Sequence, residues 1–344
     1  NKKIALLTRG NSGCNSRALF KNIPLKIKDN FSVSLIDLEE YKRSWNEYEI
    51  VFTTHMESRN YKSRFNIETW HGFPIKTIGS LEKNAVHNMT KVDDGIDYII
   101  SYSSLYSYIM SSVFKIDINK FIVTGMPRND FLANASALEL LSRLTGRDHT
   151  KGEKTIFYVP TFRNRKGKTV REGTKVFSYE DDFKIIDQYM EEIKGCFVIK
   201  KHRLEEDAIE LADYKNICFL TDDDLQRGQI DFYEILGGSD ILITDYSSVY
   251  FDYLLLNKPI IFWTKDQQVY EEKRGFLFDN IESMMPGPKV KTVSELIEII
   301  SKFMINSSWY SDERENINKL VNFYQDFNST TRVWDLLLNI YNIT

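Results

Sequence analysis

DILITDYSSVYFDYLLLNKPIIFW, residues 240–263, decides the fold class of this chain. The apolar run 240–245 predicts a buried strand, Ser247 and Ser248 open a helix, and 258–263 predicts a second strand. A strand, a helix and a strand in this order form a βαβ unit, which is typical of a parallel sheet.

The same alternation extends over the whole chain. Short apolar runs predict two series of strands, each run bounded by turn or capping residues. The first series is 4–8, 31–37, 48–54, 98–103 and 121–125, and the second is 155–162, 196–202, 216–221, 240–245 and 258–263. Helical spacing is found in 179–194, in 205–213 and throughout 293–344. We therefore expect two α/β domains of Rossmann-like type and a helical C-terminal segment.

A polar segment without apolar residues, 146–154, separates the two series. We place the first domain at 1–148, the second at 149–315, and a helical segment at 316–344 that packs back on the first domain. The length of 344 residues agrees with two domains.

Composition excludes several classes of protein. The net charge of -4 argues against a general nucleic-acid binder. The three cysteines have no metal-ligand spacing and indicate a reduced cytosolic protein. No signal peptide is visible, and no apolar run approaches the roughly 18 residues of a membrane span.

A histidine stands at another possible strand end, in the stretch TWHGFPIK, residues 69–76. The pKa of imidazole lies nearest neutrality among side chains, so His71 is a candidate general base for an attacking hydroxyl. Gly72 permits close backbone approach, and Lys76 adds a cation. The alternative is a structural histidine that caps a turn. Weaker candidates are His55, His87 and His149.

Basic residues follow other predicted strands, at the edge where parallel sheets bind ligands. Arg128 follows the run FIVT, Arg163 follows the first strand of the second series, and Lys200 and His202 end the next strand. A guanidinium can bind phosphate or carboxylate through two hydrogen bonds, so these positions suit an anionic ligand. A solvated surface charge or, for Arg128, a plain strand-to-helix turn is the alternative.

Ser247 and Ser248 predict an anion site of another kind. Hydroxyl groups and free N–H groups at a helix N-terminus bind phosphate without a metal ion. The alternative is that Ser247 only caps the helix. No P-loop and no G-x-G-x-x-G motif is present. We interpret the acidic run 222–224 as a loop opening or helix cap rather than a metal-chelating site, and we expect no metal ligands.

In this order, the motifs resemble the CDP-glycerol glycerophosphotransferase family of teichoic-acid and capsule enzymes. The stretch 231–263 is the most specific of them, and together they span nearly the whole chain. The matching stretches are NSRALF (15–20), TWHGFPIK (69–76), GMPRND (125–130), VPTFRNR (159–165), IKKH (199–202), residues 231–263, YEEKRGFLFD (270–279) and PGP (286–288).

The resemblance implies a glycosyltransferase-B-like arrangement, with the donor in the C-terminal domain and the acceptor reaching the cleft from the N-terminal domain. His71 is then the base that deprotonates the acceptor hydroxyl, which attacks the β-phosphorus of the donor and releases CMP. The implied donor-phosphate ligands are Arg163, Lys200, His202, Ser247 and Ser248. Asp231, Glu234 and Asp245 are implied at the donor ribose or nucleotide, with the motif's own backbone as the alternative for Asp231 and Glu234. Residues implied at the cleft or the acceptor are Gly72, Lys76, Arg128, Asn15 and Arg17.

The resemblance also implies the partners. The donor is a CDP-polyol, with CDP-glycerol as the default, and the acceptor is a lipid-linked or polymeric glycan or polyol phosphate. No cofactor is tightly bound, and the enzyme acts in the cytoplasm, peripherally at the inner face of the plasma membrane. Ribitol-phosphate transfer and a nucleotide-sugar glycosyltransferase are the alternatives. The chain starts almost at its first strand and has no evident basic amphipathic helix, which argues against processive polymerisation and strong membrane association; a primase remains open.

Overall fold

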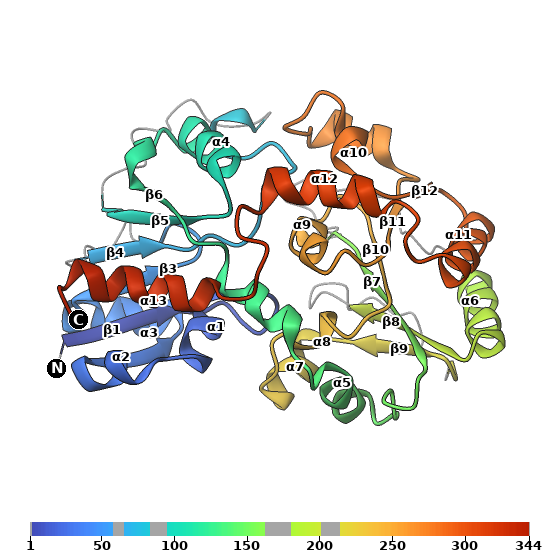
Figure 1. The fold of residues 1–344 in the computed structure, drawn as a ribbon, viewed down its shortest axis with the longest axis horizontal. Helices are drawn as coiled ribbons and strands as arrows, with labels where there is room; N and C mark the ends of the chain where they lie inside the picture. Colours follow the sequence, from blue (N-terminus) through green and yellow to red (C-terminus); the bar gives the residue numbers. More distant parts are fainter. Residues whose placement is uncertain (1, 58–64, 83–94, 162–179, 201–213, 344) are drawn as a thin grey trace.

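The computed structural model describes residues 2–57, 65–82, 95–161, 180–200 and 214–343, which form two six-stranded parallel sheets with helices packed against them (Figure 1). The predicted α/β class is confirmed. The two sheets lie side by side, and each occupies one half of the molecule.

The first sheet has the order β2-β1-β3-β4-β5-β6, and every pairing in it is parallel. Its strands are β1 (Lys2–Leu7), β2 (Phe31–Ile36), β3 (Ile50–Thr53), β4 (Phe65–Glu68), β5 (Tyr98–Ser101) and β6 (Phe121–Val123). From β1 the chain first adds β2 on one side of the sheet and then β3 on the other, so the strand order reverses between β1 and β3. Ligands bind at such a switch point, outside the carboxyl ends of the strands.

The second sheet has the order β12-β11-β10-β7-β8-β9 and is also parallel throughout. Its strands are β7 (Lys154–Val159), β8 (Gly195–Lys200), β9 (Ile217–Leu220), β10 (Ile241–Thr244), β11 (Ile260–Trp263) and β12 (Lys289–Val290). Its switch point lies between β7 and β10, and the loops after these two strands therefore mark its ligand edge.

Helices connect the strands in both halves. The α-helices are α1 (Asn15–Lys21), α2 (Leu25–Asn30), α3 (Leu38–Ser44), α4 (Ser104–Phe114), α5 (Ala137–Thr145), α6 (Glu180–Glu192), α7 (Asp222–Gly228), α8 (Tyr233–Leu236), α9 (Val249–Tyr253), α10 (Gln267–Lys273), α11 (Val293–Ile305), α12 (Ser311–Val321) and α13 (Ser329–Ile340). Short 3-10 helices are η1 (Trp45–Glu47), η3 (Gly79–Leu81), η4 (Ile118–Lys120), η5 (Pro127–Ala133), η6 (Leu254–Leu256) and η7 (Ile281–Met284).

Sequence patterns predicted most of these elements. The ten predicted strands are all present, whereas β4 and the two-residue β12 were missed as strands. The helix predicted over 179–194 corresponds to α6, and the one over 205–213 lies outside the described residues. The acidic run 222–224 opens α7, and Thr221 and Asp224 form a capping box there, which confirms the helix-cap interpretation.

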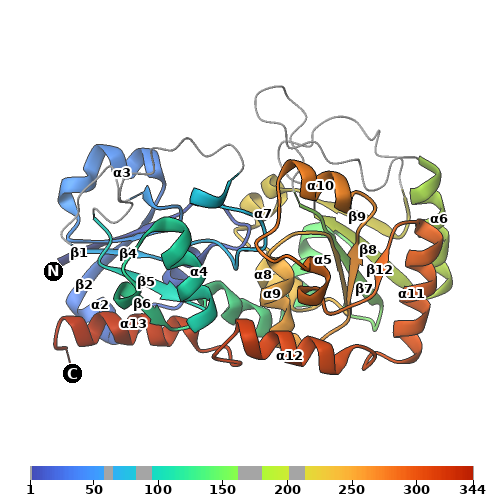
Figure 2. The ribbon, with the colours of Figure 1, turned by 90° about the horizontal axis from the view of Figure 1, so that it is seen from above.

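The expectation of helix throughout 293–344 is wrong in one respect, because the segment forms three helices. Breaks separate α11 from α12 and α12 from α13, and Tyr310 adopts a positive φ of 63° directly before α12. After α12 the chain returns to the first half, where α13 runs beside the first sheet (Figure 2). The indole of Trp334 packs 5.7 Å from the ring of Phe52 and donates to Leu19 O.

The largest buried hydrophobic cluster among the described residues extends across both halves, so the halves share part of their core. At their junction, the rings of Phe73 and Phe251 lie 4.7 Å apart. Among the described helices, none is both long enough and apolar enough to cross a bilayer.

Candidate active site

The loop after β4 of the first sheet faces the switch point of the second sheet, and the two sides enclose a cavity of about 220 Å³. From the first half, the loop after β4 supplies most of the wall; from the second, Thr161 follows β7 and Ser248 follows β10. The cavity is lined by Trp70, His71, Gly72, Phe73, Pro74, Ile75, Lys76, Ile78, Thr161, Ser248, Tyr270, Lys273 and Arg274. This position agrees with the rule that ligands bind at the carboxyl edge of parallel sheets.

The hydrogen bond made by His71 fixes which ring nitrogen carries the proton. Its Nδ1 lies 3.0 Å from the carbonyl oxygen of Thr54. A carbonyl oxygen only accepts hydrogen bonds, so Nδ1 is the donor and Nε2 of the neutral ring keeps the lone pair. The ring is stacked on His55 at 4.1 Å with an interplanar angle of 11°, and it lies 4.2 Å from Trp70. The side chain is therefore oriented as a proton acceptor at Nε2.

The surroundings of His71 also hold the ring neutral. Burial of the ring among protein atoms removes water from its charged form and lowers the pKa of His71 to about 4. The hydrogen bond to the Thr54 carbonyl raises this pKa, and the nearby Arg128 cation lowers it. The residue is nevertheless exposed on its cavity side. Water on that side weakens these effects, and their direction leaves His71 unprotonated at neutral pH.

Two buried carboxylates shape the loop that carries Thr54. Glu57 accepts from the N–H groups of Thr54 (3.0 Å) and His55 (2.7 Å) and from Arg9 Nε (3.0 Å). Glu68 accepts from the N–H of Trp70 at 2.7 Å, and burial raises the pKa of its carboxyl to about 7. Sequence reasoning named neither glutamate. The signal available for Glu68 was its place at the end of the run FNIE, directly before the histidine motif.

Gly72 brings the two halves into close contact at the cavity. Its φ is +147°, a conformation that side-chain-bearing residues rarely adopt. A Cβ at this position would lie 2.5 Å from Ser248 Oγ and 3.2 Å from Arg128 Nη2. The backbone beside the candidate base therefore packs directly on the serine that was predicted to bind donor phosphate.

Arg128 is buried and binds protein groups, which differs from the open anion site that the sequence predicts. Nη1 donates to the carbonyl oxygens of Gly13 (3.1 Å) and His71 (2.8 Å). Nη2 donates to Asp252 Oδ2 at 2.6 Å and to the hydroxyl of Tyr102. Arg128 thus joins the histidine loop of the first half to α9 of the second.

Asn15 is also an organising residue in this structure. Its amide nitrogen donates to the carbonyl oxygens of Thr69 (3.1 Å) and Trp70 (3.0 Å), and its Oδ1 accepts from the N–H of Arg128. Nearby, Arg17 is half-buried, and its Nε has no hydrogen-bond partner among the described residues. Lys76 Nζ reaches across the cavity to Thr161 Oγ1 at 3.3 Å.

The acidic residues of the 231–263 stretch contact backbone. Asp231 is fully buried and accepts from the N–H groups of Gly13 and Cys14, at 3.1 and 3.0 Å, and from that of Tyr233. Glu234 accepts from the N–H of Asp231 and forms a 2.5 Å ion pair with Lys21. The N–H groups of Tyr233 and Asp231 are the motif's own backbone, as in the alternative, whereas the bonds to Gly13 and Cys14 join Asp231 to the first half.

Three of the remaining predicted donor residues, Asp245, Ser247 and Ser248, follow β10 at the second switch point. Asp245 Oδ1 accepts from the N–H and hydroxyl of Thr161, at 2.8 and 2.6 Å, and so bridges β10 to β7. Ser247 and Ser248 are half-buried before α9, and it is Ser248 that occupies the N-cap, without a side-chain capping bond. Lys200 is buried and pairs with Asp222 at 2.6 Å. Arg163 and His202 lie outside the described residues.

Sequence reasoning missed two cations of the cavity wall, Lys273 and Arg274. Both belong to the stretch YEEKRGFLFD, which carried part of the family resemblance but no assigned site residue. Together with Lys76 they give the cavity positive side chains from both halves.

Two parallel sheets whose carboxyl edges meet at a shared cleft define a glycosyltransferase-B-like enzyme class. The chain belongs to the CDP-glycerol:poly(glycerophosphate) glycerophosphotransferase family, whose model matches residues 38–339. The family predicted from the motifs is therefore confirmed.

Relatives and a solved structure agree with this membership. The chain is 31% identical over 274 residues to a teichoic acid poly(glycerol phosphate) polymerase of Bacillus spizizenii, covering 76% of this chain and 65% of the relative. It is 32% identical to a teichoic acid poly(ribitol-phosphate) polymerase of the same species, covering 76% and 40%. The chain thus spans between about two fifths and two thirds of these relatives' length. The wall teichoic acid polymerase TagF superposes with a TM-score of 0.76 at 22% identity, covering 98% of this chain and 89% of TagF, which confirms the fold.

Proposed function

We propose that this chain transfers glycerol phosphate from CDP-glycerol to a hydroxyl group of a cell-envelope polymer or of its lipid-linked primer, with release of CMP. The observation that carries the proposal is the environment of His71. Its Nδ1 donates a hydrogen bond to the Thr54 carbonyl oxygen, so its Nε2 keeps the lone pair. Its ring lines a cavity whose wall also contains cationic side chains. The family membership supports this chemistry.

In the proposed reaction, Nε2 of His71 takes the proton of the acceptor hydroxyl. The acceptor oxygen forms a bond to the phosphorus that carries the glycerol, and the bond from that phosphorus to the oxygen of CMP breaks. CMP leaves with the electron pair of this bond. A base positioned for such a transfer contributes about 10²–10⁴ in rate.

The cationic wall would serve the phosphates of the donor. Lys76, Lys273 and Arg274 line the same cavity as His71, and Ser248 lies where α9 begins. Positive groups fixed before the reaction stabilise the charge that develops on the transferring phosphoryl group and on departing CMP. We retain Ser247, Lys200, Arg163 and His202 as proposed donor ligands, and the scheme requires no tightly bound cofactor.

The acceptor and the place of action follow from the same proposal. Names of relatives refer to teichoic acids, so we infer an envelope polymer or a lipid-linked primer as acceptor, met at the cytoplasmic face of the membrane. CDP-ribitol is the second candidate donor, because identity to the ribitol-phosphate polymerase equals that to the glycerol-phosphate polymerase within 1%.

The test combines turnover with binding. CMP release is measured with CDP-glycerol, CDP-ribitol and UDP-sugars in the presence of an acceptor, for the wild type and for His71→Ala. We expect turnover with a CDP-polyol, a loss of about 10²–10⁴ in His71→Ala, and an unchanged rise in melting temperature when the variant binds the donor. Mass spectrometry should find phosphate retained in the transferred unit. Turnover of a UDP-sugar without phosphate transfer, or full activity of His71→Ala, would overturn the proposal.

A further inference from the structure

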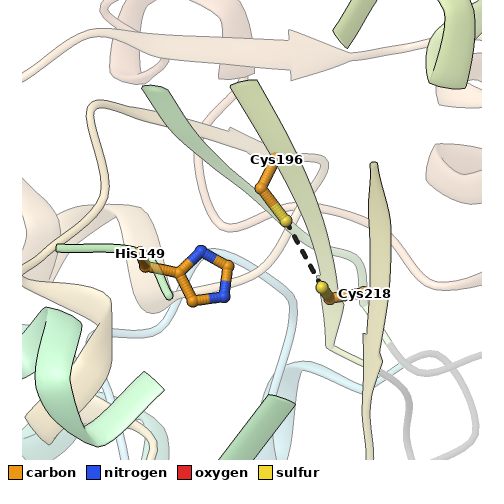
Figure 3. A group of neighbouring side chains, drawn as sticks. All are labelled: His149, Cys196 and Cys218. Atoms are coloured by element: carbon orange, nitrogen blue, oxygen red, sulfur yellow. Dashed lines mark hydrogen bonds between the residues drawn. The ribbon is translucent and has the colours of Figure 1, made fainter. Parts of the chain in front are cut away.

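A histidine and two cysteines from three distant segments meet at the amino ends of β8 and β9 (Figure 3). His149 comes from the segment 146–153 between α5 and β7, Cys196 from β8 and Cys218 from β9. One imidazole nitrogen and the two sulfurs all lie within 4.8 Å of one another. In the described part of the chain, no other group of His, Cys, Asp and Glu side chains has this geometry.

The parallel register places the two cysteines on one face of the sheet. Val198 is the partner of Cys218, and Cys196 stands two residues before Val198. Side chains two residues apart on a strand point to the same side, so the thiols meet diagonally. Their sulfurs are 3.3 Å apart, and Cys196 is fully buried.

The histidine is held towards the sulfurs by its own segment. Its backbone N–H donates to Ser142 Oγ at 2.9 Å, and its side chain is fully buried. Nδ1 lies 2.9 Å from Glu153 Oε2, and Glu153 is also paired with Arg147. A carboxylate on the second ring nitrogen is the arrangement that orients metal-bound histidines in proteins. Nε2 is then the nitrogen left for a metal ion, in exchange for its present contact with Thr145 Oγ1 at 2.8 Å.

The Cys196 thiol donates a hydrogen bond to the sulfur of Cys218, and the fully buried imidazole of His149 lies beside both sulfurs. A buried thiol pair without a ligand is the alternative, since free cysteines commonly lie in protein interiors. The oriented imidazole beside the pair is what distinguishes this cluster from that alternative.

The distances are compatible with a tetrahedral ion after a small adjustment. Bonds of about 2.3 Å to sulfur and about 2.0 Å to nitrogen place the ligand atoms about 3.3–3.8 Å apart. The sulfurs, at 3.3 Å, would move apart slightly, and one imidazole nitrogen already lies within 4.8 Å of both. Two thiolates and an imidazole suit Zn²⁺ among common cellular cations, with water as the fourth ligand.

We propose that His149, Cys196 and Cys218 bind a thiophilic divalent metal ion, Zn²⁺ by their chemistry, which ties the segment joining the two sheets to β8 and β9. The site lies at the edge of the sheet opposite to the loops that follow β7 and β10, where the cavity is found. Its role is therefore structural, and the inference is independent of the proposed transferase function.

The test begins with the wild-type protein, purified with a reductant and without chelator. We expect bound zinc by elemental analysis, near one ion per chain, and a higher melting temperature with zinc than after its removal. After exchange into Co²⁺, the thiolate-to-cobalt charge-transfer band and the visible bands of a tetrahedral ion should appear. Failure of the wild type to hold zinc and to give the cobalt spectrum overturns the proposal, whatever the variants do.

The chain provides a matched control for the variants. Cys196→Ser and Cys218→Ser should lose the cobalt spectrum and the zinc-dependent rise in melting temperature. Cys14→Ser should keep both, because the third cysteine is also buried but lies beside Thr8 in the first half. A cobalt spectrum that survives both cluster variants, or that Cys14→Ser removes, overturns the assignment. A disulfide between Cys196 and Cys218 in protein prepared without oxidant does so as well.

Discussion

The substitution Gly72→Ala tests whether contact between the two halves holds the loop that carries the candidate base His71. The added Cβ would lie 2.5 Å from Ser248 Oγ and 3.2 Å from both Ser248 Cβ and Arg128 Nη2. Real Cβ atoms do not approach so closely, so the loop or the serine must move. Overpacking of this kind costs about 1–3 kcal/mol, and the φ of +147° adds about 1–3 kcal/mol of backbone strain for alanine.

The matched control is Gly10→Ala. Gly10 has a φ of +128°, yet a Cβ there would meet no atom within 4 Å. The Gly10→Ala variant therefore measures the cost of backbone strain at a positive φ without a steric clash of the added Cβ. We expect denaturant unfolding to give a free energy loss for Gly72→Ala that exceeds the loss for Gly10→Ala by about 1–3 kcal/mol. Turnover of the CDP-polyol should fall in Gly72→Ala, since the displaced loop carries His71.

Ser248→Ala in the Gly72→Ala background separates contact from strain. Removing Oγ leaves the nearest Ser248 atom at 3.2 Å, so part of the lost stability should return. The two substitutions should couple by about 0.5–3 kcal/mol in a double-mutant cycle. The reasoning is refuted if Gly72→Ala is as stable as Gly10→Ala, or if the cycle shows no coupling.

Other predictions concern titration, the buried ion pair and α13. The pKa values of His71 and His55 are lowered to about 4 and about 2, so their contribution to stability is full above pH 6.5 and is lost as the pH falls from there towards these values. The raised pKa values of Glu68 and Asp231 act in the opposite direction, so the contribution is measured as the difference in unfolding free energy between the wild type and His55→Ala, which should shrink as the pH falls below 6.5. As the pH falls, the decline of kcat/KM should be centred below pH 6.5, because the pKa of His71 is lowered in the free enzyme. The decline of kcat should be centred at a higher pH than that of kcat/KM, because donor phosphates stabilise the imidazolium. A decline of kcat/KM centred at 6.5 contradicts the assignment. Asp252→Ala leaves Arg128 buried without its carboxylate and should cost about 3–5 kcal/mol in denaturant unfolding, and a loss below about 1 kcal/mol contradicts the pairing. Asp130→Ala removes the acceptor for the first two N–H groups of α13 and should cost about 0.5–2 kcal/mol, with faster hydrogen exchange there; unchanged exchange speaks against this cap.

The pattern of apolar residues along the sequence predicted the strands well where a strand consists mainly of apolar residues. It failed at β4, where Asn66 and Glu68 interrupt a strand of four residues. Both polar side chains are buried, and each has a partner that is distant in sequence: Asn66 donates to the carbonyl oxygen of Gly95, and Glu68 accepts from Thr53 as well as from the nearby Trp70. A short window of neighbouring residues contains neither Gly95 nor Thr53. Polar residues in a central strand next to the candidate base are a local conflict of the kind expected at functional sites.

The cluster of His149, Cys196 and Cys218 escaped sequence reasoning for a different reason. Metal-ligand motifs are recognised by short spacings within one loop or hairpin. Here 22 residues separate the cysteines, and 47 separate the histidine from the first of them. Strand pairing in a parallel sheet brings together residues that a crossover connection keeps apart in sequence. The segment 146–154 is polar in sequence, yet the side chain of its histidine is fully buried.

For Arg128, the sequence predicted the kind of group that the side chain binds but not the residue that provides it. The sequence identified a guanidinium at a strand end that should bind a carboxylate or phosphate in a bidentate way. The structure supplies a carboxylate, but it belongs to Asp252, 124 residues along the chain. The same guanidinium holds the carbonyl oxygen of His71, and Asn15 binds the carbonyl oxygens of Thr69 and Trp70. The candidate base is therefore positioned by groups from both halves, so a change at their junction should alter catalysis without touching the substrate. That is why Gly72→Ala, and not only His71→Ala, is a test of the proposed mechanism.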